Sequence, residues 1–198
     1  MNENMTENDV TQSSPPQQPQ TKQSKKNAII KEILSYVKIL VVTFICVFIF
    51  NHYIIANAFV PTGSMESTIE TGSRIFINRL SYVNSNPQRG DIVSFLYPDD
   101  ESENYLKRII GLPGETIEGK DGEVYIDGVK LTENYIKDKI DEDFGPFTVP
   151  KDCYFMMGDN RTNSWDSRYW EHTFVSKDKI IGKAVLKYYP HIENLCEK

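Results

Sequence analysis

The chain has 198 residues, of which 39% are hydrophobic and 25% charged, and its formal net charge is −6. Residues 59–198 hold 17 Lys and Arg against 24 Asp and Glu, a net charge of −7. This acidic piece is a poor match for nucleic acid, because nucleic-acid binding depends on cations that neutralise phosphates.

The first 27 residues, MNENMTENDVTQSSPPQQPQTKQSKKN, contain almost no side chain that could build a core. Gln, Ser, Pro, Asn and Thr dominate, a composition typical of disordered segments. We predict a disordered tail over residues 1–32, up to the start of the apolar segment that follows.

The most apolar segment is ILSYVKILVVTFICVFIFNHYIIA, residues 33–56, with a single charged residue, Lys38, near its beginning. As a helix it would extend roughly 36 Å, enough to cross a hydrocarbon core of about 30 Å. Lys38 lies near one edge, from which its stem can reach the headgroups. A buried helix of a globular protein is the alternative, but the apolar stretch has no polar face. We predict a transmembrane anchor.

The lysines of the chain's first part stand before this segment or near its start, whereas the first cation after it is Arg74. The positive-inside rule therefore places residues 1–32 in the cytoplasm and residues 57–198 outside the cytoplasmic membrane. A cleaved secretory signal is the alternative, since ANA at 56–58 resembles a small-x-small cleavage site. The charged region before it is too long for an ordinary signal peptide, and cleavage there would leave Ser64 near a frayed end.

Beyond the anchor, apolar residues alternate with period two between recurring turn signals, which predicts strands. The clearest hairpin is EVYIDGVKL at 123–131, where Asp127-Gly128 fits a type I′ turn, and Pro113-Gly114 fits a type II turn. The other predicted strands are SRIFINRL (73–80), DIVSFLY (91–97), YLKRIIGL (105–112), CYFMMG (153–158) and IIGKAVLKYY (180–189). We expect a mainly β fold: an antiparallel β domain over residues 57–198 with short loops and little helix, about large enough for one core.

Two acidic stretches, DDESEN (99–104) and ENYIKDKIDEDFGP (133–146), are predicted to be exposed loops, and RGD at 89–91 a polar turn rather than an adhesion motif. Cys153 lies in CYFMMG, where a buried free thiol is the commoner state, although a disulfide with Cys196 stays open. No spacing of Cys and His indicates a metal site, and no cofactor is expected.

The stretch VPTGSMESTI (60–69) places Ser64 in a Gly-Ser turn, where a nucleophile could be held out for attack. A serine hydroxyl is inert at neutral pH unless a base takes its proton. The three histidines offer no obvious base, since His52 ends the apolar segment while His172 and His191 lie in ordinary polar contexts.

Lys107 in YLKRIIGL is a second candidate for chemistry. Strand alternation places it on one face with Tyr105 and Ile109, while Leu106 and Arg108 share the other. Most strand lysines are solvated cations. The alternative is a buried lysine held neutral as a base, which requires moving its pKa from about 10.4 to roughly 7–8, or about 4 kcal/mol, and burial can supply this.

A third candidate is GDNRTNSWDSR at 158–168, which is dense in small polar residues and follows a predicted strand. Ser164, Asp166 and Arg168 fall on one side of an extended stretch, and the last two are positioned to form an ion pair. An Asx-rich loop would account for the composition alone, but converging polar side chains also suit the scaffold of a site.

Taken together, GSMESTI, RGDIVSF, YLKRIIGLPGE and GDNRTNSWDSR, in this order after an N-terminal anchor, closely resemble the bacterial type I signal peptidases. The resemblance covers about residues 58–187, and GDNRTNSWDSR is very specific by itself. It implies a membrane-anchored serine endopeptidase that removes signal peptides from exported preproteins by means of a Ser/Lys dyad.

The resemblance assigns the nucleophile to Ser64 and its base to Lys107, a variant of the serine–histidine arrangement. Thr62 would offer its hydroxyl to the oxyanion beside the Ser64 backbone N–H. Ser164 would hydrogen-bond the Lys107 amine and orient it, with Tyr105 close by. The remaining supporting residues would be Asp159 and the ion pair of Asp166 and Arg168.

Two features depart from the family's usual pattern. Ser67 stands where the family usually has a proline, three residues after the nucleophile, which is expected to loosen the backbone past Ser64 slightly and to leave the dyad intact. The stretch between LPGE and GDNR is short, as in the compact forms from Gram-positive bacteria that lack a large inserted second domain.

We expect the substrate's cleavage region to lie extended beside residues 58–61 and 104–107 and to add a strand there. Side chains at −1 and −3 would enter shallow apolar pockets that reject residues larger than alanine, which would explain small-x-small specificity. The predicted lining residues are Val60, Pro61, Met65, Ile69 and Leu106.

Two alternatives remain. One is a membrane-anchored binding module without catalytic activity, against which the presence of Ser64, Lys107, Thr62 and Ser164 argues. The other is a peptidase with the same dyad that cleaves itself or matures one dedicated client.

Overall fold

The structure, a computed structural model, describes residues 22–196. The chain divides into two compact units, Met1–Cys46 and Val47–Lys198. The prediction of disorder for residues 1–21 lies outside the described residues.

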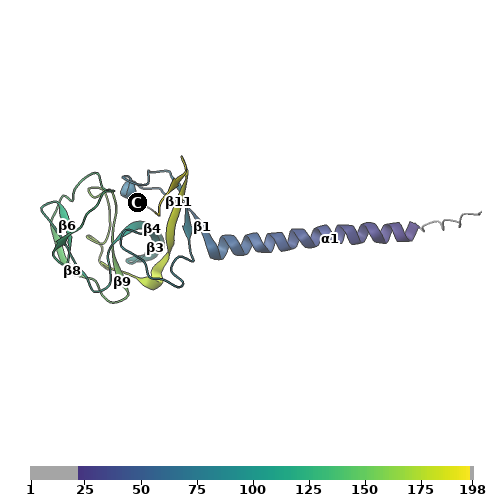
Figure 1. Cartoon of the computed structure of the whole chain (residues 1–198), viewed down its shortest axis with the longest axis horizontal. Coiled ribbons are helices and arrows are strands. Elements are labelled where there is room, and N and C mark those ends of the chain that lie inside the picture. Colours follow the sequence, from purple (N-terminus) through teal and green to yellow (C-terminus); the bar gives the residue numbers. More distant parts are fainter. Residues whose placement is uncertain (1–21, 197–198) are drawn as a thin grey trace, which may run out of the picture. The chain divides into compact units, whose positions relative to one another are not determined.

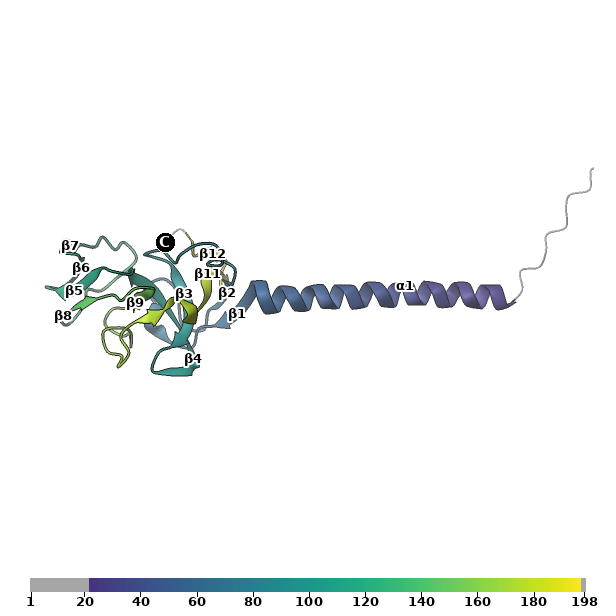
Figure 2. The same ribbon diagram turned by 90° about the horizontal axis from the view of Figure 1, so that it is seen from below.

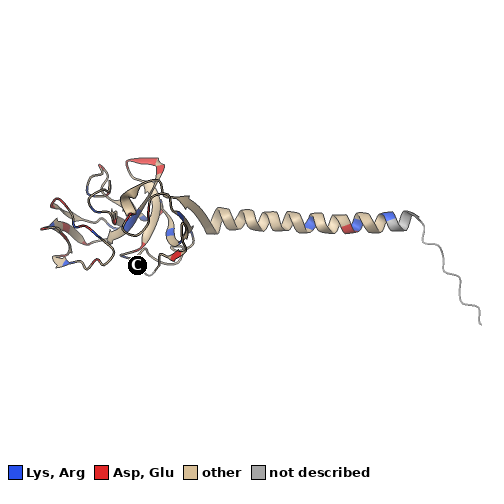
Figure 3. Ribbon diagram, turned by 90° about the horizontal axis from the view of Figure 1, so that it is seen from above, with Lys and Arg blue, Asp and Glu red and all other residues tan. Residues whose placement is uncertain are grey.

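One long helix, α1 (Lys22–Ile49), is followed by a π-helical turn, Phe50–Ile54. The stretch Lys26–Ile54 is long and apolar enough to cross a membrane, and its apolar window is not buried. Figure 3 shows that the charged residues of α1 lie in its N-terminal part. The helix begins inside the predicted tail, because residues 22–32 are mostly good helix formers and extending a helix costs little. At the other end, Ile55 and Ala56 belong to a strand rather than to the anchor.

The second unit is built on a large sheet of eight strands in the order β1-β2-β11-β3-β4-β9-β10, with β12 paired to β11. Its strands are β1 (Ile55–Phe59), β2 (Arg74–Asn78), β3 (Ile92–Tyr97), β4 (Asp100–Gly111), β9 (Cys153–Met157), β10 (Val175–Ser176), β11 (Ile180–Tyr189) and β12 (Glu193–Asn194). Neighbouring strands pair antiparallel. The predicted mainly antiparallel β fold is confirmed.

A smaller sheet has four strands in the order β7-β6-β5-β8. These strands are β5 (Thr116–Lys120), β6 (Glu123–Ile126), β7 (Val129–Lys130) and β8 (Phe144–Thr148). The predicted hairpin is confirmed, because Asp127 and Gly128 have φ of 49° and 78°, both positive as a type I′ turn requires. Figures 1 and 2 show this sheet at the opposite end of the domain from β1 and β11.

Strand β4 begins earlier than predicted, inside the acidic stretch 99–104, where Asp100 pairs with Tyr97 of β3. Pairing with β3 outweighs the low strand propensity of these acidic residues. On its other side, β4 pairs with β9 only from Arg108 onward. Within the described part of the chain, residues 103–107 therefore have one free backbone edge.

The two faces of β4 contribute to different cores. Leu106 packs against a cluster that includes Met65 and Ile77, whereas Tyr105 packs against one that includes Ile109 and Trp170. The predicted alternation along β4 is therefore confirmed. A third cluster joins the large sheet to the small one. Within this framework of sheets and cores, residues 103–107 form one wall of a groove.

Candidate active site

Ser64 lies on a short 3-10 turn, η2 (Gly63–Met65), which begins shortly after β1 ends at Phe59. Met65 is fully buried and accepts backbone hydrogen bonds at its carbonyl from the Thr68 and Ile69 N–H groups, at 2.8 and 2.6 Å. Thr62 has an extended backbone, and its side chain does not cap the turn. The core thus fixes the turn through Met65, and Ser64, 9% exposed, lies at its edge.

The loop 158–168 holds this turn from outside. The Ser64 carbonyl accepts a hydrogen bond from the Asn160 backbone N–H at 3.0 Å, and the Gly63 carbonyl accepts one from Asn160 Nδ2 at 3.0 Å. Gly158 packs so closely that a Cβ there would collide with both the Ser64 carbonyl oxygen and Ser164 Oγ. Glycine is therefore required at position 158 for the loop to approach the turn.

We expect Gly158→Ala to lower the cleavage rate at least about tenfold and the free energy of unfolding by about 1–3 kcal/mol, because the added methyl group displaces the Ser64 turn. Cleavage and urea unfolding of the full chain in detergent micelles measure both effects. Gly128→Ala is the matched control, since its φ of 78° makes it strained but its Cβ meets nothing within 4 Å. Gly128→Ala should lose stability without losing activity. Equal activity of the two variants would contradict the role of loop 158–168 in holding the Ser64 turn.

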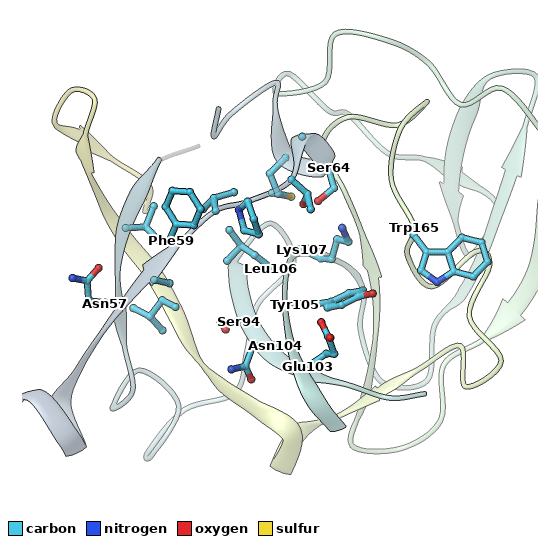
Figure 4. Close-up of a pocket in the computed structure, with 18 of the residues that line it drawn as sticks. Asn57, Phe59, Ser64, Ser94, Glu103, Asn104, Tyr105, Leu106, Lys107 and Trp165 are labelled. Carbon is cyan, nitrogen blue, oxygen red and sulfur yellow. The ribbon is translucent and has the colours of Figure 1, made fainter. Parts of the chain in front are cut away.

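Lys107 lies on β4 opposite Val93 of β3 and is only 4% exposed. Figure 4 shows its side chain extending toward Ser64. Its Nζ is 5.7 Å from the centre of the Tyr105 ring, so the predicted proximity of Tyr105 is present.

Burial lowers the pKa of Lys107 from 10.5 to about 8, Asp166 and Asp159 oppose this shift, and Arg168 reinforces it. Neither carboxylate forms an ion pair with the lysine, because each is paired with an arginine. At pH 7 about a tenth of the molecules then carry a neutral amine at this position.

The predicted ion pair of Asp166 and Arg168 is present and bidentate, with Nε–Oδ1 and Nη2–Oδ2 distances of 2.8 and 2.9 Å. Asp166 Oδ2 also accepts a hydrogen bond from the Gly158 N–H at 3.0 Å. Arg168 Nη2 donates to the Arg161 carbonyl at 3.0 Å. The pair therefore connects both ends of the loop that clamps Ser64.

Asp159 does not face Lys107; it pairs with Arg108 on the opposite face of β4. Arg108 donates from Nε and Nη2 to the two carboxylate oxygens at 2.8 and 2.6 Å, and both side chains are fully buried. Thr68 Oγ1 donates to Asp159 Oδ2 at 2.5 Å. Asp159 thus joins β4 to the segment that follows Ser64. The sequence analysis did not identify Arg108 as the partner of this carboxylate.

The predicted hydrogen bond from Ser164 to the Lys107 amine is not formed. Ser164 Oγ is buried without a hydrogen-bond partner in the described part of the chain, and it lies against Gly158. Residues 158–168 form turns and bends rather than the extended stretch that the sequence suggested.

The acidic stretch 133–146 is not a wholly exposed loop. The Glu133 side chain is 4% exposed and pairs with Arg161, whose side chain is 1% exposed. Arg161 Nε also donates to the Gly158 carbonyl at 3.0 Å. Tyr135, two residues after Glu133, places its ring 3.9 Å from the Arg108 guanidinium carbon. The stretch 133–146 therefore packs against both buried arginines, Arg161 and Arg108.

A groove of about 610 Å³ lies between β1 with the residues that follow it and the free edge of β4. Ser64, Lys107, Thr62 and Tyr105 line it. Of the predicted apolar lining residues, Val60, Pro61, Met65 and Leu106 contribute. Ile69 does not; it is fully buried one turn behind Met65. Figure 4 shows the groove with Phe59 and Leu106 on one side and Tyr105 and Trp165 on the other.

Ala58, Phe59 and Asn104 also line the groove, and they belong to the segments 58–61 and 104–107 that were expected to lie beside the substrate. Several further lining residues were not predicted. They come from β1, β2, β3, the start of β4 and the loop 158–168: Asn57, Ile75, Ile77, Ser94, Glu103, Asn163 and Trp165. The alternation of Ile75 and Ile77 marked them as an apolar face, but only the pairing of β2 with β1 and β11 brings them to the groove.

Within residues 22–196, no three His, Cys, Asp or Glu side chains are grouped so that they could hold a metal ion. Cys153 and Cys196 are both free, so the disulfide that the sequence left open is not formed.

Residues 33–189 match the family model for "Signal peptidase, peptidase S26". A signal peptidase I from Leptolyngbya laminosa is 36% identical over 188 residues, which cover 91% of this chain and 90% of that protein. Signal peptidase I S from Bacillus subtilis is 38% identical over 174 residues, 82% of this chain and 92% of that protein. A crystal structure of a signal peptidase I from Enterococcus faecalis, 38% identical, covers 50% of this chain and 97% of its own, with a TM-score of 0.44.

Proposed function

This chain belongs to the peptidase S26 family of signal peptidases, and on that premise we propose that Ser64 is its nucleophile and Lys107 its general base. It is a signal peptidase I, a serine endopeptidase that cleaves signal peptides. One observation supports this assignment most strongly: Ser64 and a buried lysine line the same groove. No histidine of the described residues lines it.

In the proposed reaction, neutral Lys107 takes the proton of Ser64 Oγ as that oxygen attacks the scissile carbonyl. The lysine then gives the proton to the leaving amine and afterwards activates the water that hydrolyses the acyl-enzyme. The oxyanion is stabilised by the Ser64 N–H and the Thr62 hydroxyl, which is not used to cap η2. Loss of one such donor typically costs about 100- to 1,000-fold in rate.

The free edge of β4 at residues 103–107 suggests where the substrate binds. A peptide that enters the groove in an extended conformation can form main-chain hydrogen bonds with this edge, while residues 58–61 form the opposite wall. Side chains at −1 and −3 would point to the floor near Met65 and Leu106, where Ile77 and Ser94 limit the depth. A shallow floor favours alanine-sized residues and rejects larger ones.

The apolar helix is proposed to anchor the protein in the lipid bilayer of the cytoplasmic membrane as a single span. All lysines that precede Arg74 lie in α1 between residues 22 and 38, on the N-terminal side of its most apolar stretch, so the N-terminus would be cytoplasmic and residues 57–198 extracytoplasmic. Signal peptides of exported preproteins emerge on that side with their own apolar segments still in lipid. The anchor would thus keep the groove where its substrates are.

The activity is expected to rise with pH through the pKa of Lys107. Below pH 8 the amine is protonated and inactive, so kcat/KM should increase about tenfold per pH unit; above about pH 8 it should level off. Initial rates on a peptide substrate between pH 6 and 10 measure this profile. A rate that is independent of pH from 6 to 8 would contradict a lysine base with this pKa.

A panel of unrelated exported precursors tests the function as a whole. The full chain in detergent micelles should cleave most of them after small-x-small sites, as N-terminal sequencing of the products can establish. Cleavage of only the chain itself or of a single precursor would favour the alternative of a peptidase that processes itself or one specific substrate protein. Absence of any cleavage, with signal peptides still bound, would favour a binding module.

A further inference from the structure

The middle residue of the small-x-small motif would meet a different surface from its neighbours. Figure 4 shows Asn104 and Leu106 on one side of β4, and Glu103, Tyr105 and Lys107 on the other. A substrate strand beside β4 alternates in the same way, so if −1 and −3 face the Leu106 side, the −2 side chain faces Tyr105.

That side of the groove is aromatic and held in place. Trp165 lines the groove and is 56% exposed, and its Nε1 donates to the Tyr97 hydroxyl at 3.2 Å. The Tyr97 and Tyr105 rings stack with their centroids 4.3 Å apart. The indole also stacks on the Tyr169 ring, with the centroids 5.5 Å apart. The exposed indole thus forms a fixed flat surface next to the position of the −2 side chain.

The same side also carries a carboxylate, at the end away from Lys107 (Figure 4). Glu103 lines the groove, and its carboxylate forms no ion pair within the described residues. Burial, and after it the carboxylates of Glu103, Asp100 and Asp99, raise the pKa of Tyr105. An exposed aromatic surface beside unpaired negative charge fits a long cationic side chain, which gains a cation–π contact and an ion pair.

We propose that Trp165, Tyr105 and Glu103 form a subsite for the −2 side chain, and that it favours Arg or Lys over neutral residues and disfavours Asp and Glu. This inference rests on the proposed function, because it takes its register from cleavage at Ser64. The proposed subsite adds a preference at −2, whereas the shallow floor of the groove selects residues only at −1 and −3.

The test compares three peptides that span the cleavage site, each with Ala at −3 and −1, and with Arg, Gln or Glu at −2. For the full chain in detergent micelles at low salt, kcat/KM should be about fivefold higher for Arg than for Gln, and about tenfold higher for Arg than for Glu. Trp165→Ala should remove the advantage of Arg over Gln. Glu103→Gln should remove most of the difference between Arg and Glu.

Ratios within one variant are compared, so a general loss of rate does not affect the result. Tyr189→Ala is the matched control, because Tyr189 is equally exposed at 56% and lies outside this groove. It should keep the wild-type ratios. Equal kcat/KM for the three peptides, or a preference for Arg that survives Trp165→Ala, would overturn the proposal.

Binding of the same peptides to the Ser64→Ala variant, followed by tryptophan fluorescence, separates this inference from the proposed function. Tighter binding of the Arg peptide supports the subsite even if the wild type cleaves none of them, in which case the proposed function fails alone. Equal binding of the three peptides overturns the subsite even if all of them are cleaved.

Discussion

Replacement of Lys107 by Met is expected to abolish precursor cleavage and, at the same time, to make the protein more stable. Activity is lost because a thioether cannot take the proton of Ser64. Stability rises because the charged amine is disfavoured in its buried position: a pKa lowered from 10.5 to about 8 corresponds to about 3 kcal/mol at pH 7. The folded state binds its proton less tightly than the unfolded state, so this gain should be complete below pH 8 and fade as the pH rises to 10.5.

Three companion variants make the measurement decisive. Ser64→Ala should be equally inactive without the gain in stability. Lys107→Arg should also be inactive, since a guanidinium stays charged and cannot act as a base. Lys151→Met removes an exposed lysine and should keep both activity and stability, within about 0.5 kcal/mol. Cleavage assays and urea unfolding of the full chain give the two readouts, and measurable processing by either Lys107 variant would rule out this lysine as the base.

Removal of one partner of the Arg108–Asp159 pair is expected to lower the free energy of unfolding by about 3–5 kcal/mol. Both side chains are fully buried, so either Arg108→Met or Asp159→Asn leaves a buried group without its partner. Cleavage should fall as well, because Asp159 holds Thr68 and thereby the turn that carries Ser64. Urea unfolding followed by tryptophan fluorescence, together with cleavage rates, measures both effects.

The double variant Arg108→Met/Asp159→Asn should recover part of the lost stability, since it leaves no uncompensated charge. Lys179→Met is the matched control: it breaks the exposed pair with Glu101 and should leave stability nearly unchanged. If the single variants lose no more free energy of unfolding than this control, the buried pair is not a main connection between β4 and the turn that carries Ser64.

Much of the fold could be predicted because its strands carry local signals. Alternation in YLKRIIGL indicated which residues of β4 share a face, and Asp127-Gly128 specified a turn that only residues tolerant of positive φ form easily. The juxtaposition of Ser64 and Lys107, in contrast, was not readable from periodicity. It depended on motifs that matched a family, because the two residues lie on elements that meet only through the sheet.

The remainder depends on tertiary contacts that no local pattern reports. An arginine beside a lysine in a strand, or a glutamate in an acidic loop, is normally solvated, and nothing near Arg108 or Glu133 in the sequence reveals the partner that permits its burial. Ile69 and Ile77 are equally apolar, yet only Ile77 reaches the groove, since the turn after η2, in which the Ile69 N–H bonds to the Met65 carbonyl, places Ile69 behind Met65. Tertiary packing decides which of these side chains are buried and which of them line the groove.

The low pKa of Lys107 also makes this residue chemically distinguishable from the other lysines of the protein. An amine reacts with electrophiles in its free-base form and not as an ammonium ion, and at neutral pH an ordinary lysine is almost entirely ammonium. A small aldehyde or isocyanate that enters the groove of about 610 Å³ would therefore modify this side chain ahead of the exposed lysines. The residue proposed as the general base is thus also the natural attachment point for a selective covalent inhibitor.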